Sequence, residues 1–158
     1  MTFDDAFAKL LGHEGGFADH PADPGGRTRW GVTERVAREH GYTGDMRDLP
    51  VEEARRIARI AYWDAVRADS LPPRVRYLVF DAAYHSGVRQ SARWLQRALG
   101  VAEDGVIGPV TIAAARAADE GRLVTRVLAQ RLRFMTSLGN WHSFSRGWAR
   151  RIADLMET

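Results

Sequence analysis

The sequence lacks cysteine, contains a single lysine and has no long apolar run. Without cysteine, neither a disulfide framework nor a thiolate zinc site can form, which is consistent with synthesis in a reducing cytoplasm. No segment approaches the roughly 18 consecutive apolar residues of a membrane-spanning helix, so we expect no stable membrane insertion. The first residues carry acids where a signal peptide carries basic residues, so we expect no export signal.

Charge is nearly balanced overall but uneven along the chain. The formal net charge is only +3, whereas residues 121–158 hold seven arginines against Asp154 and Glu157. Such a basic end could contact nucleic acid, an anionic wall polymer or a lipid surface, or could be a solvated helix face. The solvated face is the favoured interpretation, and we expect no nucleic-acid partner.

Alternation of apolar and polar residues with a period of two is nearly absent, and a period of 3.6 dominates. The 158 residues suffice for one core. We therefore predict a mainly α-helical single domain, with a loop over residues 15–27 and one small β-hairpin near residues 26–33. Helices are expected over residues 2–14, 33–40, 51–66, 74–87, 88–100, 110–118, 122–139 and 143–156.

The first predicted helix ends on a carboxylate that lies on its apolar side. Thr2 and Asp5 have the spacing of a capping box, and two glycines follow Glu14. Glu14 shares a face with the expected buried stripe, which consists of Phe3, Phe7, Leu10 and Leu11.

Burial and the negative end of the helix dipole would both raise the pKa of Glu14. A carboxyl group with its ordinary pKa of about 4.3 has already lost its proton at neutral pH, so a raised pKa suits a general acid. Glu14 is therefore a candidate acid, and an ordinary helix-ending glutamate is the alternative.

A second set of polar residues follows in the loop and hairpin. Hydrolysis of a glycosidic bond needs one group to protonate the leaving oxygen and another to stabilise the transition state or activate water. Asp23 and Thr28 could supply the second function opposite Glu14. Asp19 competes for that role, and Asp23 could instead belong to the turn chemistry of its Asp-Pro-Gly sequence.

The run HEGGF…DPGGRTRWGVT resembles the N-terminal signature of glycoside hydrolase family 108, which comprises lysozyme-like N-acetylmuramidases found mostly as phage endolysins. Further blocks, YWDAV, FDAAYHSG, WLQRALGV and DGVIGPVT, are similar to the rest of that family in the same order. The resemblance covers roughly residues 4–150. It implies a catalytic half over residues 1–87 and a helical, peptidoglycan-binding half over residues 88–158, packed as one lysozyme-like domain.

The resemblance also implies a reaction. The expected activity is cleavage of the β-1,4 bond between N-acetylmuramic acid and N-acetylglucosamine, without a cofactor, by a monomer with Glu14 as the acid. Phe17 stands where the family usually has tyrosine, and four residues separate Asp23 from Thr28 where many phage lysozymes have five. Whether the anomeric centre is inverted or retained stays open. Access to the wall is expected through a holin, cell lysis or virion delivery.

Aromatic side chains are candidates for stacking on sugar rings, with a place in the core as the alternative for each. Trp30 and Tyr84 are expected in the cleft, and Tyr62 and His85 are further candidates for substrate binding, although the favoured role for His85 is that of a hydrogen-bonded helix-end histidine. The DGVIGP turn is either structural or part of a binding surface. We expect no metal site, because the spacing of the acids and histidines in residues 13–23 fits neither zinc nor calcium.

Overall fold

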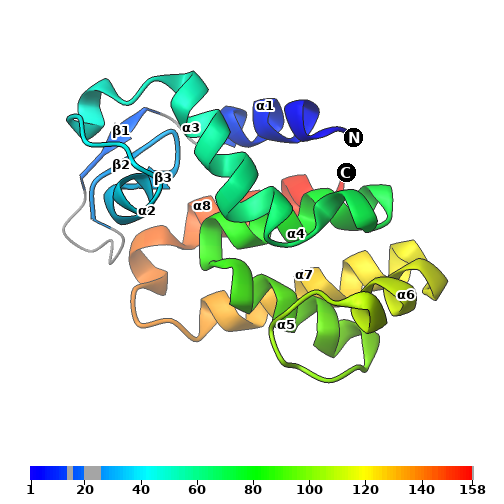
Figure 1. The fold of residues 1–158 in the computed structure, drawn as a ribbon. Coiled ribbons are helices and arrows are strands. Elements are labelled where there is room, and N and C mark those ends of the chain that lie inside the picture. The colour runs from blue at the N-terminus through cyan, green and yellow to red at the C-terminus, as the bar shows by residue number, and fades with distance from the viewer. Residues whose placement is uncertain (14–15, 20–25, 158) are drawn as a thin grey trace. The chain divides into compact units, whose positions relative to one another are not determined.

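The computed structural model describes residues 1–13, 16–19 and 26–157. The chain forms two compact units, Met1–Ala65 and Val66–Thr158. The first contains α1 (Phe3–His13), β1 (Phe17–Ala18), β2 (Thr28–Arg29), β3 (Val32–Thr33), α2 (Glu34–Glu39), a 3-10 turn (Met46–Asp48), α3 (Val51–Ala58) and a π-helical segment (Arg59–Asp64). The second contains a 3-10 turn (Ala68–Ser70), α4 (Pro73–Ser86), α5 (Val88–Leu99), α6 (Pro109–Ala117), α7 (Glu120–Thr136) and α8 (Trp141–Met156). The prediction of a mainly α-helical fold is confirmed (Figure 1).

Helix α1 begins at the predicted capping box. The backbone N–H of Thr2 donates to Asp5 Oδ2 at 2.8 Å, and the N–H of Asp5 donates to Thr2 Oγ1 at 3.2 Å. Phe3, Phe7 and Leu10 are buried as predicted, but Leu11 is only half-buried, and Ala6 is buried instead. At about 100° per residue, Ala6 and Leu11 flank the other three side chains on opposite sides, so the buried stripe is shifted toward Ala6 and away from Leu11.

The sheet contains one strand more than the predicted hairpin. Strands β2 and β3 form that hairpin, and β1 adds to its open edge to give a three-stranded antiparallel sheet in the order β1-β2-β3. Residues 17–18 had been assigned to the loop. A two-residue strand is too short to show an alternating pattern, so its pairing depends on a partner outside its own sequence.

The predicted helix over residues 51–66 changes its hydrogen-bond register part-way. It is α-helical only to Ala58 and π-helical from Arg59 to Asp64. Tyr62 and Trp63 are buried in the π-helical segment. Hydrophobic periodicity indicates a helix here but does not distinguish an i→i+4 from an i→i+5 hydrogen bond.

Helix α4 is central to the second unit. It packs against α5 and α7, and α7 in turn packs against α5 and α8 (Figure 1). Side chains on all faces of α4 are buried, as expected of a helix surrounded by protein. The buried residues are Val75, Tyr77, Leu78, Val79, Phe80, Asp81, Ala82, Ala83 and Tyr84.

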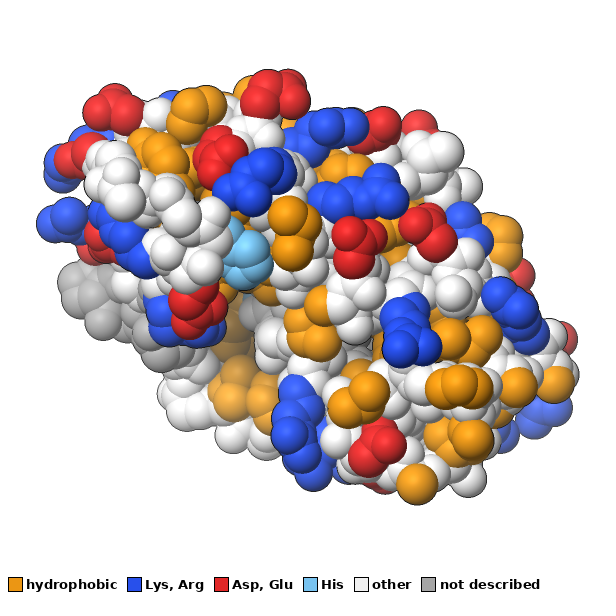
Figure 2. Space-filling view, viewed as in Figure 1, with side chains coloured by type: hydrophobic (Ala, Val, Ile, Leu, Met, Phe, Trp, Pro, Cys, Tyr) orange, Lys and Arg blue, Asp and Glu red, His pale blue; other side chains and the backbone are white. Residues whose placement is uncertain are grey.

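The surface is charged and mixed. Figure 2 shows basic and acidic side chains interspersed over the viewed face, with hydrophobic side chains gathered over the region of α6. Val106 precedes α6 and is 62% exposed, and Val110 lies in the first turn of α6 and is 72% exposed. Over the described residues, none of the helices combines the length and hydropathy needed to cross a bilayer.

Candidate active site

Helix α1 ends at His13, directly before the candidate acid. Glu14 and the second candidate, Asp23, both lie outside the described residues. The described part of the site therefore consists of the helix that leads into Glu14 and the sheet that follows it. On that helix, Phe3, Phe7 and Leu10 keep one face buried up to the turn before position 14.

Thr28 lies on the central strand of the sheet. Its position on β2 pairs with Ala18 of β1 on one side and with Thr33 of β3 on the other. The side chain is half-buried. A residue whose backbone is held from both sides has little conformational freedom, so the Thr28 hydroxyl is attached to a rigid support.

Trp30 occupies an unusual backbone conformation in the turn between β2 and β3. Trp30 and Gly31 form a two-residue hairpin loop with φ of +54° and +79°, the signs of a type I′ turn. A bulky residue rarely adopts a positive φ, and such strain is concentrated at functional sites. The indole is fixed, because its Nε1–H donates to the Leu49 carbonyl at 2.9 Å and the Arg29 guanidinium lies 5.2 Å from the ring centroid. The half-buried ring is thus held in place.

Asp19, the competitor for the second catalytic role, forms an ion pair. Arg27 Nε lies 3.5 Å from Asp19 Oδ2, and about half of each side chain is exposed to solvent. The pair links the end of β1 to the residue before β2, which favours a role for Asp19 in holding this loop.

The tyrosines proposed as sugar contacts are both buried. Tyr62 and Tyr84 are each 7% exposed. Burial raises the pKa of Tyr62 to about 12, with Arg35 acting in the opposite direction, so its hydroxyl stays protonated at neutral pH. The Tyr84 ring packs edge-on against Phe80, with 5.9 Å between centroids. Rings with so little exposed surface offer a sugar only an edge or a hydroxyl group.

His85 follows Tyr84 and lies beside charged and aromatic groups of the second unit. Its ring makes an edge-on contact with Trp148 of α8, with centroids 6.2 Å apart. Burial, together with the nearby guanidinium groups of Arg151 and Arg131, lowers the pKa of His85 to about 3. His85 is therefore neutral at physiological pH and can donate one hydrogen bond and accept another.

No cluster of three or more acids and histidines suited to a metal ion occurs among residues 1–13, 16–19 and 26–157. The histidine and aspartate at positions 20 and 23 lie outside those ranges.

Comparison with known families and structures identifies the chain. The pattern of the family described as Glycosyl hydrolase 108 matches residues 7–87, and that of the family described as Predicted Peptidoglycan domain matches residues 90–153. The chain belongs to glycosyl hydrolase family 108. It is therefore a glycosidase by family, and its function is connected with peptidoglycan.

The structural comparison extends this result to the whole chain. Brucella abortus SagA is 34% identical to this chain, with a TM-score of 0.91 over 98% of this chain and 91% of that one. Together with the helices and the small sheet, this similarity confirms the expected lysozyme-like fold. No curated protein matches the sequence.

A buried charge cluster in the second unit was not predicted from the sequence. Asp81 of α4 accepts hydrogen bonds from Arg131 Nη1 of α7 at 2.5 Å and from Arg151 Nη2 of α8 at 2.7 Å. Asp81 and Arg131 are fully buried, and Arg151 is nearly so. Two of the seven arginines assigned to a basic C-terminal end therefore neutralise an interior carboxylate. The signal in the sequence was an aspartate within the most apolar helix, because a buried carboxylate requires a cationic partner.

A partly exposed aromatic cluster lies on α8, and its rings Phe144 and Trp148 were not predicted from the sequence. Trp148 stacks on Phe144 with 5.5 Å between centroids and an interplanar angle of 23°, and it lies 5.9 Å from Trp141. All three rings are half-buried. By contrast, Trp63 and Trp94 are buried in the core. Half-exposed rings that support one another provide the kind of apolar surface on which the C–H face of a sugar stacks.

Proposed function

We propose that this glycosidase is a muramidase that hydrolyses the β-1,4 bond between N-acetylmuramic acid and N-acetylglucosamine in peptidoglycan. Glu14 acts as the general acid and protonates the glycosidic oxygen. Asp23 and Thr28 act on the opposite side of the bond, where they position water or stabilise the oxocarbenium-like transition state. The place of action that we propose is the bacterial cell wall, reached by holin-type release, lysis or virion delivery.

The observation that carries this proposal is the buried face of α1. Phe3 and Phe7 are each 4% exposed, and Leu10 is fully buried. On a regular helix, position 14 continues that face. An apolar environment at a helix C-terminus raises a carboxyl pKa, as a general acid at neutral pH requires.

The remaining contacts to the glycan are proposed to be aromatic. Trp30 is the first candidate, because its indole is held at a fixed position in a strained turn beside Thr28. In the second unit, Trp141 and Trp148 with His85 supply half-buried rings and a neutral imidazole. Tyr62 and Tyr84 would contribute through an edge or a hydroxyl group, because their ring faces are covered.

The central prediction is that Glu14→Gln abolishes hydrolysis while the fold remains intact. Loss of a general acid lowers the rate about 10²-fold to 10⁴-fold. The measurement is the release of reducing ends from purified peptidoglycan, with mass spectrometry to identify the reducing-end sugar. Asp19→Asn is the matched control and should keep most of the activity, because its carboxylate is paired with Arg27.

Full activity of Glu14→Gln would exclude the proposed mechanism, and a glucosamine reducing end would exclude the proposed bond. The peptidoglycan-domain match over residues 90–153 favours one other function, that of a wall-binding protein without catalysis. In that case the unsubstituted chain would sediment with peptidoglycan but release no reducing ends at any concentration.

A further inference from the structure

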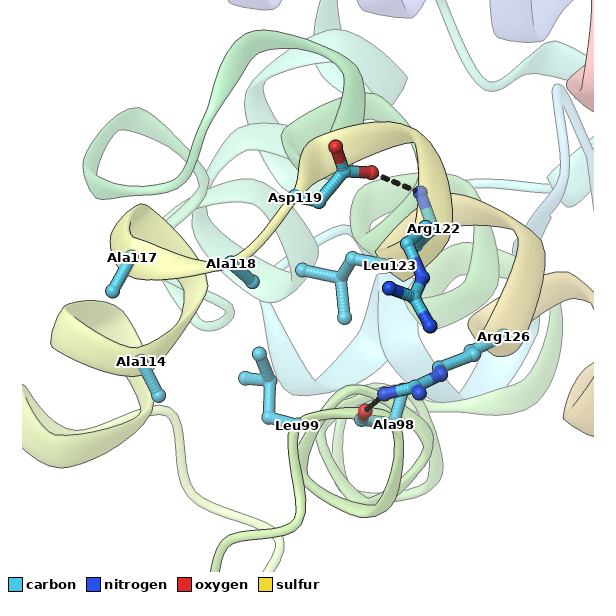
Figure 3. Close-up of a pocket in the computed structure, with 9 residues that line it drawn as sticks. All are labelled: Ala98, Leu99, Ala114, Ala117, Ala118, Asp119, Arg122, Leu123 and Arg126. Carbon is cyan, nitrogen blue, oxygen red and sulfur yellow. Dashed lines mark hydrogen bonds between the residues drawn. The ribbon is translucent and has the colours of Figure 1, made fainter.

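A cavity lies between α5, α6 and α7 of the second unit (Figure 3), and its lining includes none of the residues of the proposed active site. Its volume is about 320 Å³, within the range of small-molecule sites. It is lined by Ala98, Leu99, Ala114, Ala117, Ala118, Asp119, Arg122, Leu123 and Arg126.

The cavity has an apolar side and a cationic side. Figure 3 shows the alanines of α6 on one side and the side chains of Arg122 and Arg126 on the other, with Leu99 and Leu123 between them. Methyl groups on one side and guanidinium groups on the other suit a small ligand that carries both a methyl group and an anion.

The two arginines lack an acidic partner in the part of the chain that the structure describes. Among the described residues, Arg126 Nη1 donates to the Ala98 carbonyl at 3.4 Å. The Asp119 carboxylate accepts the backbone N–H of Arg122 at 2.8 Å and so serves as the N-cap of α7. In contrast, the neighbouring Arg97 is paired with Glu103 at 2.6 Å.

The spacing of these arginines is unfavourable unless an anion joins them. Arg122 and Arg126 are four residues apart on α7, where like charges repel one another. A carboxylate placed between them would relieve this repulsion and accept hydrogen bonds from both planar guanidinium groups. Both side chains are exposed, so they are accessible to a ligand from solvent.

We propose that this cavity binds the C-terminal carboxylate of a short peptide that ends in alanine. The carboxylate lies between Arg122 and Arg126, and the alanyl methyl group lies against the alanines of α6. Peptide stems of peptidoglycan end in this way, so the proposal rests on the proposed function for its source of ligand and adds a peptide-recognition site to it.

The test is a titration of the full chain with N-acetyl-D-alanyl-D-alanine, followed by ¹H–¹⁵N NMR. Saturable shifts are expected at residues 114–123 and in the last turn of α5. Arg126→Gln should weaken binding about tenfold, the loss expected for one charge-assisted contact. The C-terminal amide of the same dipeptide, which lacks the negative charge, should bind the unsubstituted chain no more tightly than the acid binds Arg126→Gln. Arg133→Gln is the matched control, because it removes the same charge from an exposed position of α7 that does not line the cavity.

Equal affinity for the acid and the amide, or unchanged binding by Arg126→Gln, would overturn the proposal. Displacement of the dipeptide by inorganic phosphate at an equal concentration would also overturn the proposal, because the site would then recognise any anion. The probe contains no glycosidic bond, so the result does not depend on hydrolysis. A chain that binds the dipeptide but releases no reducing ends would refute the proposed activity and support the proposed peptide site. A chain that releases reducing ends but does not bind the dipeptide would support the activity and refute the peptide site.

Discussion

At the scale of single residues, the carboxylate of Asp81 lies in the interior and is shared by two guanidinium groups. Burial favours the protonated form of Asp81, but Arg131 and Arg151 outweigh it and hold the pKa of Asp81 well below its ordinary value. The cluster therefore carries a net positive charge inside the second unit. Such a cluster contributes less to stability than its short distances suggest, because all three groups have lost their hydration.

Removing one member of the cluster should nevertheless be severe. We expect Asp81→Asn to lower the free energy of unfolding by about 3–5 kcal/mol, because two buried guanidinium groups would lose their counter-charge. Urea denaturation followed by circular dichroism measures this effect. Glu157→Gln, the loss of an exposed acid in the same unit, should change stability by less than about 0.5 kcal/mol.

A triple variant separates the charge from the shape of the cluster. Asp81→Leu with Arg131→Met and Arg151→Met should recover most of the stability, since an apolar replacement of a buried ion cluster is often neutral or stabilising. Stability of Asp81→Asn equal to that of the unsubstituted chain would show that the charge is compensated by another group.

Local residue pairs were predictable, and distant ones were not. Thr2 and Asp5 are three positions apart, so their capping box could be recognised from the sequence alone. Asp81 lies 50 positions from Arg131 and 70 from Arg151. Their pairing depends on how α4, α7 and α8 pack together, which no local pattern encodes.

At the scale of elements, a buried glutamine fixes the loop between α5 and α6. Gln96 is 1% exposed, and its Nε2 donates to Asp104 Oδ1 at 2.6 Å and to the Val106 carbonyl at 3.0 Å. Its Oε1 accepts the backbone N–H of Gly105 at 2.9 Å. Gly105 has a φ of +78°, which explains why glycine stands at this point of the DGVIGP turn.

Replacement of this glutamine tests whether the loop depends on it. Gln96→Leu should destabilise the chain by about 2–3 kcal/mol, because it leaves the Gly105 N–H and the Val106 carbonyl without their buried partner. Amide hydrogen exchange at Gly105 should accelerate in the same variant. Gln90→Leu is the matched control on α5 at a half-buried position, and similar effects of both substitutions would show that the loop is held in another way.

Elements with strong local signals were predicted well. The helices predicted over residues 33–40, 74–87 and 110–118 have ends within one residue of those of α2, α4 and α6. Strand β1 and the π-helical segment were missed, since a two-residue strand and a change of hydrogen-bond register leave no periodic trace. The turn of Trp30 and Gly31 was recognised as a hairpin, but the positive φ of a tryptophan could not be anticipated from its side chain.

At the scale of the whole molecule, the ordered succession of motifs predicted more than any single element. The blocks from HEGGF to DGVIGPVT gave the family and the fold, both of which are confirmed. The assignments of Glu14, Asp23, Thr28 and the sugar contacts stay predictions. The cavity of the second unit had no sequence signal, because alanines and arginines on three helices become a site only when those helices pack.

The stability of the folded chain should decrease in mild acid because of His85. Its pKa is about 3 in the folded chain against an ordinary value of 6.5, so between these values the unfolded chain binds a proton that the folded chain does not. The free energy of unfolding should therefore fall as the pH falls below about 6, by about 1 kcal/mol per pH unit. Asp81, Arg131 and Arg151 face this ring, and all three keep their charges throughout that range.

The acids with lowered pKa values do not contribute in this window. The stability that Asp81, Glu53 and Asp104 contribute through ionisation is present above their unfolded pKa values and is lost only below about pH 4.5. Urea denaturation at several pH values between about 5 and 7 therefore isolates the histidines. His85→Gln should flatten the profile there, and an unchanged slope in that variant would assign the effect to another histidine.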